Sequence, residues 1–265
     1  GQIDDLIKSA LDRPDSLKTP LIHHVLRLGV TQLFFMDVRD HASVDTSVRL
    51  VEELGYAGQK GFVNAVLRTL SREGFARLEK QDAARLNTPE WLLKIWIDDY
   101  GLKVAGQIAQ ANMSEAPLDI RVKDKSDRAY FGNALQASEL STGTLRRMQG
   151  GNVRELEGFD DGKWWVQDAA ASLPAMLMGD VEGQHVIDMC AAPGGKTLQL
   201  ASMGAYVTAI DRSAKRLKRL EENVARMGFE DRVKIEVADG AAWTSAQAPT
   251  HILLDAPCSA TGTMR

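Results

Sequence analysis

The sequence predicts a small all-helical domain followed by an α/β domain with a doubly wound parallel sheet. Three observations support this prediction. Apolar residues recur at helical spacing early in the chain, short apolar strands alternate with helical segments late in it, and a Pro-Gly-Gly turn follows the first of those strands. At 265 residues, the chain is long enough for two domains of ordinary size.

The helical domain is predicted from residues 19–72, where residues 37–42 are expected to connect two helices. The apolar positions at helical spacing are Leu21, Ile22, Val25, Leu26, Leu28, Phe62, Val63, Val66, Leu67 and Leu70. Another helix is expected between Asn87 and Met113, with Thr88 as its N-cap and Pro89 in its first turn. Its expected apolar face consists of Trp91, Leu92, Ile95 and Trp96.

The pattern changes near Pro117. Leu118, Ile120 and Val122 alternate with polar residues, which predicts a half-buried strand, and residues 164–178 are expected to be helical. Four short apolar strands then follow at residues 186–189, 206–210, 233–237 and 252–254. A helix from Ser213 to Met227, with Gly228 at its end, separates two of them, and this alternation favours parallel pairing.

Composition excludes several classes of protein. Apolar residues make up 44% of the chain and charged residues 26%, as in ordinary globular proteins. The net charge of −4 argues against a general nucleic-acid coat, although it leaves room for a local basic patch. The two cysteines, Cys190 and Cys258, suggest neither a disulfide framework nor a metal site. Without an apolar run long enough to span a membrane, we expect a cytoplasmic protein.

The strongest motif is VIDMCAAPGGKT at residues 186–197, in which a strand leads through a glycine turn into a helix. Such a turn lets a ligand approach the backbone, and the helix N-terminus favours a carboxylate or phosphate. The spacing matches neither a dinucleotide fingerprint nor a P-loop. Asp211 and Asp239 close the next two strands, and an acid in the first of these places can accept ribose hydroxyls, with a helix N-cap as the alternative.

The second motif is DAPCSATG at residues 255–262, at the end of the fourth strand. A cysteine at this place, beside a cofactor crevice, can act as a nucleophile or in proton transfer, which makes Cys258 a candidate. The alternative is a small buried thiol, and that explanation suits Cys190 better because it continues an apolar strand.

Together the two motifs resemble those of the RNA 5-methylcytosine methyltransferases. GFVNAVLR at residues 61–68 is similar to the NusB-like helical domain of that family, and NTPEWLL and WWVQDAA resemble its middle segments. The resemblance implies a NusB-like RNA-binding domain at residues 1–80, a linker with a small α+β region at 81–160, and an incomplete Rossmann-like class I methyltransferase domain at 161–265.

The resemblance also implies S-adenosylmethionine as cofactor and small-subunit (16S) ribosomal RNA as partner. The implied cofactor-binding residues are Cys190, Ala191, Ala192, Pro193, Gly194, Gly195, Lys196, Asp211, Asp239 and Asp255. The implied catalytic residues are Cys258 and Asp255, with Asp255 near both the cofactor and the target base. In this family a cysteine thiolate attacks C6 of a flipped-out cytosine, so that C5 can take the methyl group.

One part of the family pattern is missing. The attacking cysteine of these RNA enzymes belongs to a later Thr-Cys-Ser motif, and the residue equivalent to Cys258 helps to release the product. Because the sequence contains no such motif, the role of Cys258 stays open between nucleophile and product-release base. Family members also continue with further strands, so we expect an exposed sheet edge and a missing C-terminal segment.

Two alternatives remain at this point. The chain could be a non-catalytic RNA-binding factor that retains the cofactor pocket, whereas an amino-group methyltransferase is disfavoured because Ala256-Pro257-Cys258 lacks the motif it would need. A basic cluster on the helix after Asp211 is interpreted either as a solvated face or as an RNA contact. Its members are Arg212, Lys215, Arg216, Lys218 and Arg219.

Overall fold

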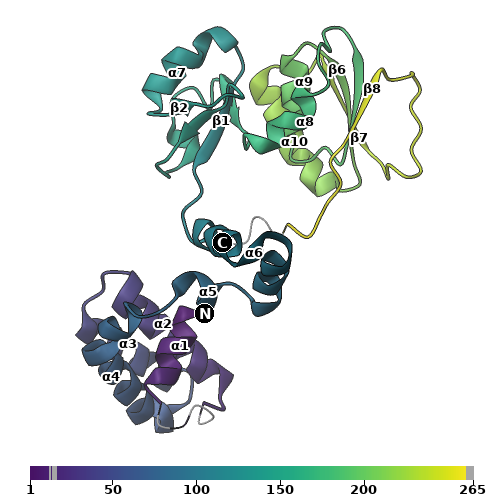
Figure 1. Cartoon of the computed structure of the whole chain (residues 1–265). Helices are drawn as coiled ribbons and strands as arrows, with labels where there is room; N and C mark the ends of the chain where they lie inside the picture. The colour runs from purple at the N-terminus through teal and green to yellow at the C-terminus, as the bar shows by residue number, and fades with distance from the viewer. Residues whose placement is uncertain (12, 14–16, 261–265) are drawn as a thin grey trace. The chain divides into compact units, whose positions relative to one another are not determined.

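The computed structural model describes residues 1–11, 13 and 17–260. The chain divides into two compact units: the first runs from Gly1 to Ser114 and the second begins at Glu115 (Figure 1). Each unit has its own apolar core, as the sequence predicts for a helical domain followed by an α/β domain.

The first unit is helical. Its helices are α1 (Gln2–Ser9), α2 (Pro20–Phe35), α3 (Asp40–Glu53), α4 (Lys60–Leu78), α5 (Ala83–Asn87) and α6 (Glu90–Asn112). The predicted positions Ile22, Val25 and Leu26 are buried in the core that α1, α2, α3 and α4 form together, whereas Leu21 and Leu28 are exposed. The connection between α2 and α3 covers residues 36–39 and overlaps the predicted residues 37–42 only in part, because α3 already begins at Asp40.

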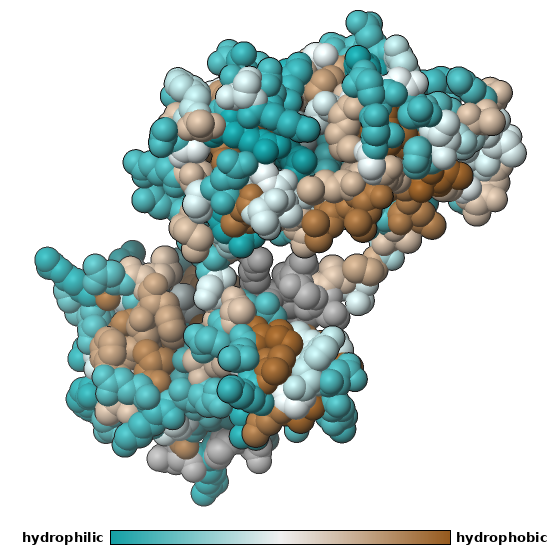
Figure 2. Space-filling view, turned by 45° about the horizontal axis from the view of Figure 1, so that its top comes forward, coloured by the Kyte–Doolittle hydropathy of each residue, from teal (hydrophilic) through white to brown (hydrophobic). Residues whose placement is uncertain are grey.

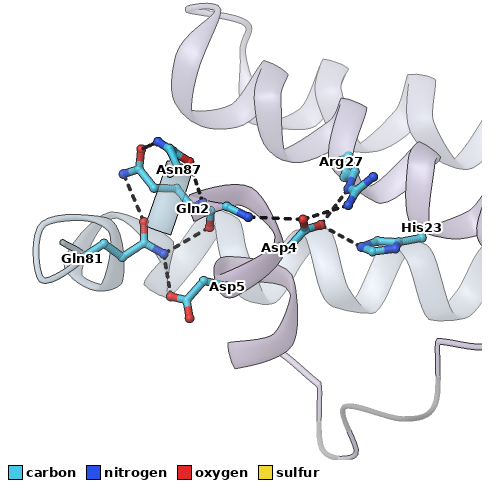
Figure 3. Close-up of polar contacts among 8 residues, drawn as sticks. Gln2, Asp4, Asp5, His23, Arg27, Gln81 and Asn87 are labelled. Carbon is cyan, nitrogen blue, oxygen red and sulfur yellow. Dashed lines mark hydrogen bonds and ion pairs between the residues drawn. The ribbon is translucent and has the colours of Figure 1, made fainter. Parts of the chain in front are cut away.

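A polar network fixes α1 within the first unit (Figure 3). Asp4 accepts hydrogen bonds from Nε and Nη2 of Arg27, at 2.7 and 2.8 Å, and its Oδ1 lies 2.8 Å from the ring of His23. The bonds from Arg27 lower the pKa of Asp4 to about 2. On the other side of α1, Gln81 donates to Asp5 at 2.7 Å. The network therefore joins α1 to α2 and to the segment that leads into α5.

Helix α6 begins one residue later than the sequence predicts. Pro89 is its N-cap, while Thr88 ends α5 by donating its hydroxyl to the carbonyl of Ala84. Gly101 interrupts the helix with a φ of 78°, a value that residues with a Cβ rarely adopt. Of the predicted apolar face, Leu92 and Trp96 are buried, and Trp91 and Ile95 are exposed.

The second unit starts with a small antiparallel sheet. Its strands are β1 (Leu118–Val122), β2 (Ser138–Glu139), β3 (Leu145–Arg147) and β4 (Trp164–Val166), in the order β2-β3-β1-β4. Helix α7 (Arg128–Ala134) packs on one face, where Ile120 and Val122 meet Phe131. The expectation of a half-buried β1 is wrong, because the polar residues Asp119 and Arg121 on its other face are buried too.

The expected helix over residues 164–178 is also wrong at its start. Trp164, Trp165 and Val166 form β4 and pair with β1, and only the short helix α8 (Leu173–Met176) follows, after a 3₁₀ turn at Ala170–Ser172. Trp164 and Trp165 are both buried, on opposite faces of the small sheet. Pairing with β1 and burial of two tryptophans therefore override the local helical pattern.

The second sheet is parallel, as predicted. It contains β5 (His185–Met189), β6 (Tyr206–Asp211), β7 (Val233–Val237) and β8 (His251–Leu254), in the order β7-β6-β5-β8. Helix α9 (Gly195–Ser202) follows β5 and helix α10 (Ala214–Met227) follows β6. Ser213, expected as the first residue of α10, is its N-cap and accepts from the Arg216 N–H. Gly228 ends the helix in the left-handed region, as the sequence predicts.

Strand β8 pairs only with β5 among the described residues, which leaves a sheet edge. Ile252 and Leu254 on this strand are 57% and 63% exposed. Apolar residues reach the surface of the molecule in several patches (Figure 2). Within the described part of the chain, no helix has the length and apolar character needed to span a membrane.

Candidate functional site

A pocket of about 460 Å³ lies at the carboxyl ends of β5 and β8, beside the start of α9. This is the edge of a parallel sheet at which ligands of doubly wound folds bind. The predicted site residues that line the pocket are Cys190, Ala191, Ala192, Pro193, Gly195, Lys196 and Asp255. Gly194, Asp211, Asp239 and Cys258 do not line it.

Two glycines, Gly194 and Gly195, determine the backbone of the turn between β5 and α9. Gly194, the N-cap of α9, has a φ of 108°. This backbone conformation favours glycine, and a Cβ at this position would also make a tight contact of 3.0 Å with Cγ of Leu220 on α10. At Gly195, a Cβ would meet nothing closer than Gln167 at 3.7 Å. Gly194 therefore shapes the turn, and Gly195 opens onto the pocket.

Asp188 anchors the start of α9 to β5. It is buried, and its Oδ2 lies 2.6 Å from the hydroxyl of Thr197 in the first turn of α9. Burial raises the pKa of Asp188 to about 6, and the hydrogen bond from Thr197 opposes that rise. Asp188 thus forms part of the pocket lining and holds the helix N-terminus against the strand.

Asp211 is buried at the end of β6, where it is hydrogen-bonded to its own surroundings. Its Oδ1 accepts from the Ser213 N–H at 2.9 Å, and its Oδ2 accepts from the Ala192 N–H at 3.3 Å. Arg216 lies 3.5 Å from the same Oδ2 and also donates to the carbonyl of Ala192 at 2.5 Å. The carboxylate therefore ties the end of β6 to the turn after β5.

Lys196 and Asp255 form an ion pair across the pocket, with 2.6 Å between Nζ and Oδ2. Lys196 is largely buried and comes from the first turn of α9, whereas Asp255 follows β8 and is 61% exposed. The two motifs of the sequence thus meet here, because β5 and β8 are neighbours in the sheet. The pair places a cation and a carboxylate together at the mouth of the pocket.

The remaining predicted residues lie outside the pocket. Asp239 accepts from the Ala241 N–H at 3.0 Å and caps a turn after β7. Cys258 is exposed, and its sulfur accepts from the Ala260 N–H at 3.3 Å.

Cys190 is partly exposed, has a φ of 63°, and lines the pocket, so the expectation that it is a small buried thiol is wrong.

Several pocket residues were not predicted as site residues. Gln167 accepts from the Trp165 indole at 3.0 Å and donates to Gln199 at 2.6 Å, which fixes the pocket wall opposite the glycine turn. The other unpredicted polar residues of the lining are Asp168, Arg219, Asn223 and Arg226. Arg219 belongs to the basic cluster on α10. Gln167 and Asp168 lie in the WWVQDAA segment, which supported the family resemblance but to whose residues the sequence assigned no role.

The model of the NusB family matches residues 1–72, and the model described as 16S rRNA methyltransferase RsmB/F matches residues 175–265. The chain is 35% identical over its full length to the ribosomal RNA small subunit methyltransferase B of Pseudomonas putida and spans 64% of the length of that protein.

Solved structures are similar as well. A methyltransferase homolog protein from Pyrococcus horikoshii aligns with a TM-score of 0.57 at 24% identity, over 69% of this chain and 64% of that one. NSun6 from Pyrococcus horikoshii, solved with SFG, aligns with a TM-score of 0.55 at 19% identity, over 64% of this chain and 71% of that one. These likenesses support the methyltransferase fold. Residues 175–265 are therefore similar to the RsmB/F methyltransferase family, and residues 1–72 are similar to the NusB family.

Proposed function

We propose that the protein binds S-adenosylmethionine in the pocket at the carboxyl ends of β5 and β8 and transfers the methyl group to cytosine C5 of small-subunit (16S) ribosomal RNA. The observation that carries this proposal is the pocket itself, in which the glycine turn after β5 and the Lys196–Asp255 pair share one space. Its volume of about 460 Å³ falls within the range of sites for small molecules.

The residues present fit the cofactor. The start of α9 offers backbone N–H groups and the positive end of a helix dipole to the carboxylate of the methionine moiety, and Gly195 leaves the approach open. We assign Asp211 to the ribose and Asp239 to the adenine side. A carboxylate can accept about four hydrogen bonds. Asp211 can therefore accept hydrogen bonds from the ribose hydroxyls on the side where Arg216 lies 3.5 Å from its Oδ2.

Bound in this way, the cofactor would supply an electrophilic methyl group, and residues of the chain would prepare the base. A thiolate would form a bond to C6, and C5 would then take the methyl group as the S–CH3 bond breaks and S-adenosylhomocysteine leaves. A base would accept the C5 proton, and the bond between C6 and the cysteine sulfur would break to restore the thiolate. We assign Asp255, which follows β8, to a hydrogen bond with the base near N3, where charge develops when the thiolate attacks. Cys258 is either the attacking thiolate or the base that removes the C5 proton.

The test combines methyl-labelled S-adenosylmethionine, protein-free small-subunit ribosomal RNA and the 265-residue chain, with 5-methylcytosine as the readout. A Cys258→Ala variant runs alongside, since loss of an essential nucleophile or base lowers the rate by orders of magnitude. If Cys258 attacks C6, the variant forms no covalent RNA adduct. If Cys258 releases the product, the variant accumulates an adduct only when another thiolate attacks C6, and Cys190 is the only other cysteine of the 265 residues. Such an adduct is visible as a protein–RNA band under denaturing conditions.

Cofactor binding is measured separately by calorimetry with S-adenosylhomocysteine. Binding without any labelled RNA would favour the rival function, an RNA-binding factor that retains the cofactor pocket. Absence of binding would contradict the proposed use of the pocket itself. Asp255→Asn is the second variant: we expect it to keep cofactor binding within about 10-fold and to slow methyl transfer by about 100-fold or more.

A further inference from the structure

A second hollow of about 410 Å³ lies in the small antiparallel sheet, between the start of α7 and the β2–β3 turn. Figure 1 shows these elements together at one end of the second unit. Its charged lining residues are three cations and one carboxylate: Arg121, Lys125, Arg128 and Glu139. It shares no lining residue with the cofactor pocket.

Arg121 carries a buried charge without an acidic partner. It shares one face of β1 with Asp119, but only Asp119 is paired, through a two-bond contact with Arg146 at 2.8 Å. Arg121 is 9% exposed and donates to the carbonyl of Thr142 at 3.1 Å; among the described residues, no carboxylate lies within 4 Å of it. Burial, and then the charge of Arg128, lower its pKa.

Arg128 adds a second guanidinium beside the first. Its side chain lies across Gly143 of the β2–β3 turn, where a Cβ would come within 2.6 Å of Nη1. Glu139 accepts from Nη1 at 3.2 Å and is itself 49% exposed. The Nε of Arg128 is buried and has no hydrogen-bond partner in the described part of the chain. One exposed carboxylate therefore faces two arginines and a lysine.

We propose that this hollow binds a backbone phosphate of the RNA substrate. The inference rests on the proposed function, in that it takes RNA as the partner. Paired arginines suit phosphate because their planar N–H groups match its oxygens, and an anion would offset charge that is now buried and unpaired. Phosphate contacts fix the position of an RNA without reading its sequence.

The charge around the hollow favours this place over its surroundings. A larger hollow of about 850 Å³ adjoins it and shares Arg121, Lys125 and Arg128. The further cations of that hollow, Lys123, Lys163 and Arg232, are offset by five acids: Asp124, Asp127, Asp161, Asp180 and Glu182. The lining of the smaller hollow thus keeps an excess of cations over its single carboxylate, whereas the further residues of the larger hollow carry more acids than cations.

The experiment measures binding of a labelled small-subunit ribosomal RNA fragment by fluorescence anisotropy at several salt concentrations. The variants are Arg128→Gln and Arg121→Met, and Lys234→Gln is the control, because it also removes one charge, from an exposed pair with Glu236 outside both hollows. We expect each arginine variant to weaken binding about 5- to 20-fold and to reduce the salt slope by about one, and the control to change neither.

Thermal unfolding separates binding from folding. Replacing a buried unpaired charge with an apolar side chain of similar size is often neutral or stabilising, so Arg121→Met should keep its unfolding temperature. Unchanged RNA affinity and salt slope in folded Arg128→Gln and Arg121→Met would overturn the proposal.

Inorganic phosphate is the second probe. If it stabilises the wild type but neither variant, while RNA binding stays the same in all three, the hollow is a site for free phosphate and the RNA assignment is wrong. Calorimetry with S-adenosylhomocysteine distinguishes this failure from failure of the proposed function, because the cofactor pocket lies elsewhere and the variants should bind the cofactor as the wild type does.

Discussion

At the scale of single residues, the buried acid Asp188 is the most informative group of the methyltransferase core. Asp188 is 1% exposed, and its carboxylate accepts a hydrogen bond from the Thr197 hydroxyl at 2.6 Å. An acid whose pKa rises on folding binds its proton more tightly in the folded state. Its contribution to stability is therefore present at low pH and is lost as the pH rises toward the folded pKa.

For Asp188 this loss falls between an ordinary pKa of 3.8 and the raised value of about 6. The size of the effect is on the order of 3 kcal/mol across that range. We expect Asp188→Asn, which keeps an acceptor for Thr197, to remove this part of the pH dependence. Urea unfolding of both proteins between pH 4 and pH 7 tests it, and parallel stability curves for the two would contradict the assignment.

At the scale of secondary structure elements, glycines at the ends of helices act differently from glycines inside them. Gly228 ends α10 with a φ of 65°, and a Cβ there would meet only Nζ of Lys123 at 3.5 Å. The cost of a side chain at this position is therefore conformational and not steric. Gly106, inside α6, has open space around it, where alanine is the better helix former.

The two positions predict effects of opposite sign. Gly228→Ala should destabilise the second unit by about 1 kcal/mol, because alanine disfavours the left-handed region. Gly106→Ala should stabilise the first unit by about 0.5–1 kcal/mol. Denaturant unfolding measures both changes, and a stabilising Gly228→Ala would contradict the role of Gly228 as a helix end. Neither substitution touches the cofactor pocket, so cofactor affinity serves as the control.

At the scale of the whole molecule, the sequence predicts what depends on local pattern. The four parallel strands, the caps of α10 and the glycine turn at the pocket follow from periodicity and from residue types at element ends. The features that the sequence does not predict depend on partners far along the chain. Trp164 becomes part of a strand because β1 pairs with it, and Arg121 is buried because the β2–β3 turn and Met176 cover it.

The same distinction applies to the candidate site. The pairing of Lys196 with Asp255 requires β5 and β8 to be neighbours, and strand order cannot be read from four short apolar segments. Gln167 lines the pocket because β4 brings its segment to the glycine turn. The sequence motifs thus locate the glycine turn of the pocket, whereas the residues of the opposite wall depend on which strands are neighbours in the fold.

The separate cores of the two units lead to a prediction for the entire chain. The core of the first unit is formed by α1 to α4, and that of the second by the parallel sheet with its helices, so calorimetry should show two unfolding transitions. A ligand that binds only one unit stabilises that unit, by about 2.7 kcal/mol at 100 times its dissociation constant. S-adenosylhomocysteine should therefore raise one transition and leave the other unchanged. A single transition that shifts with the ligand would mean that the units unfold together.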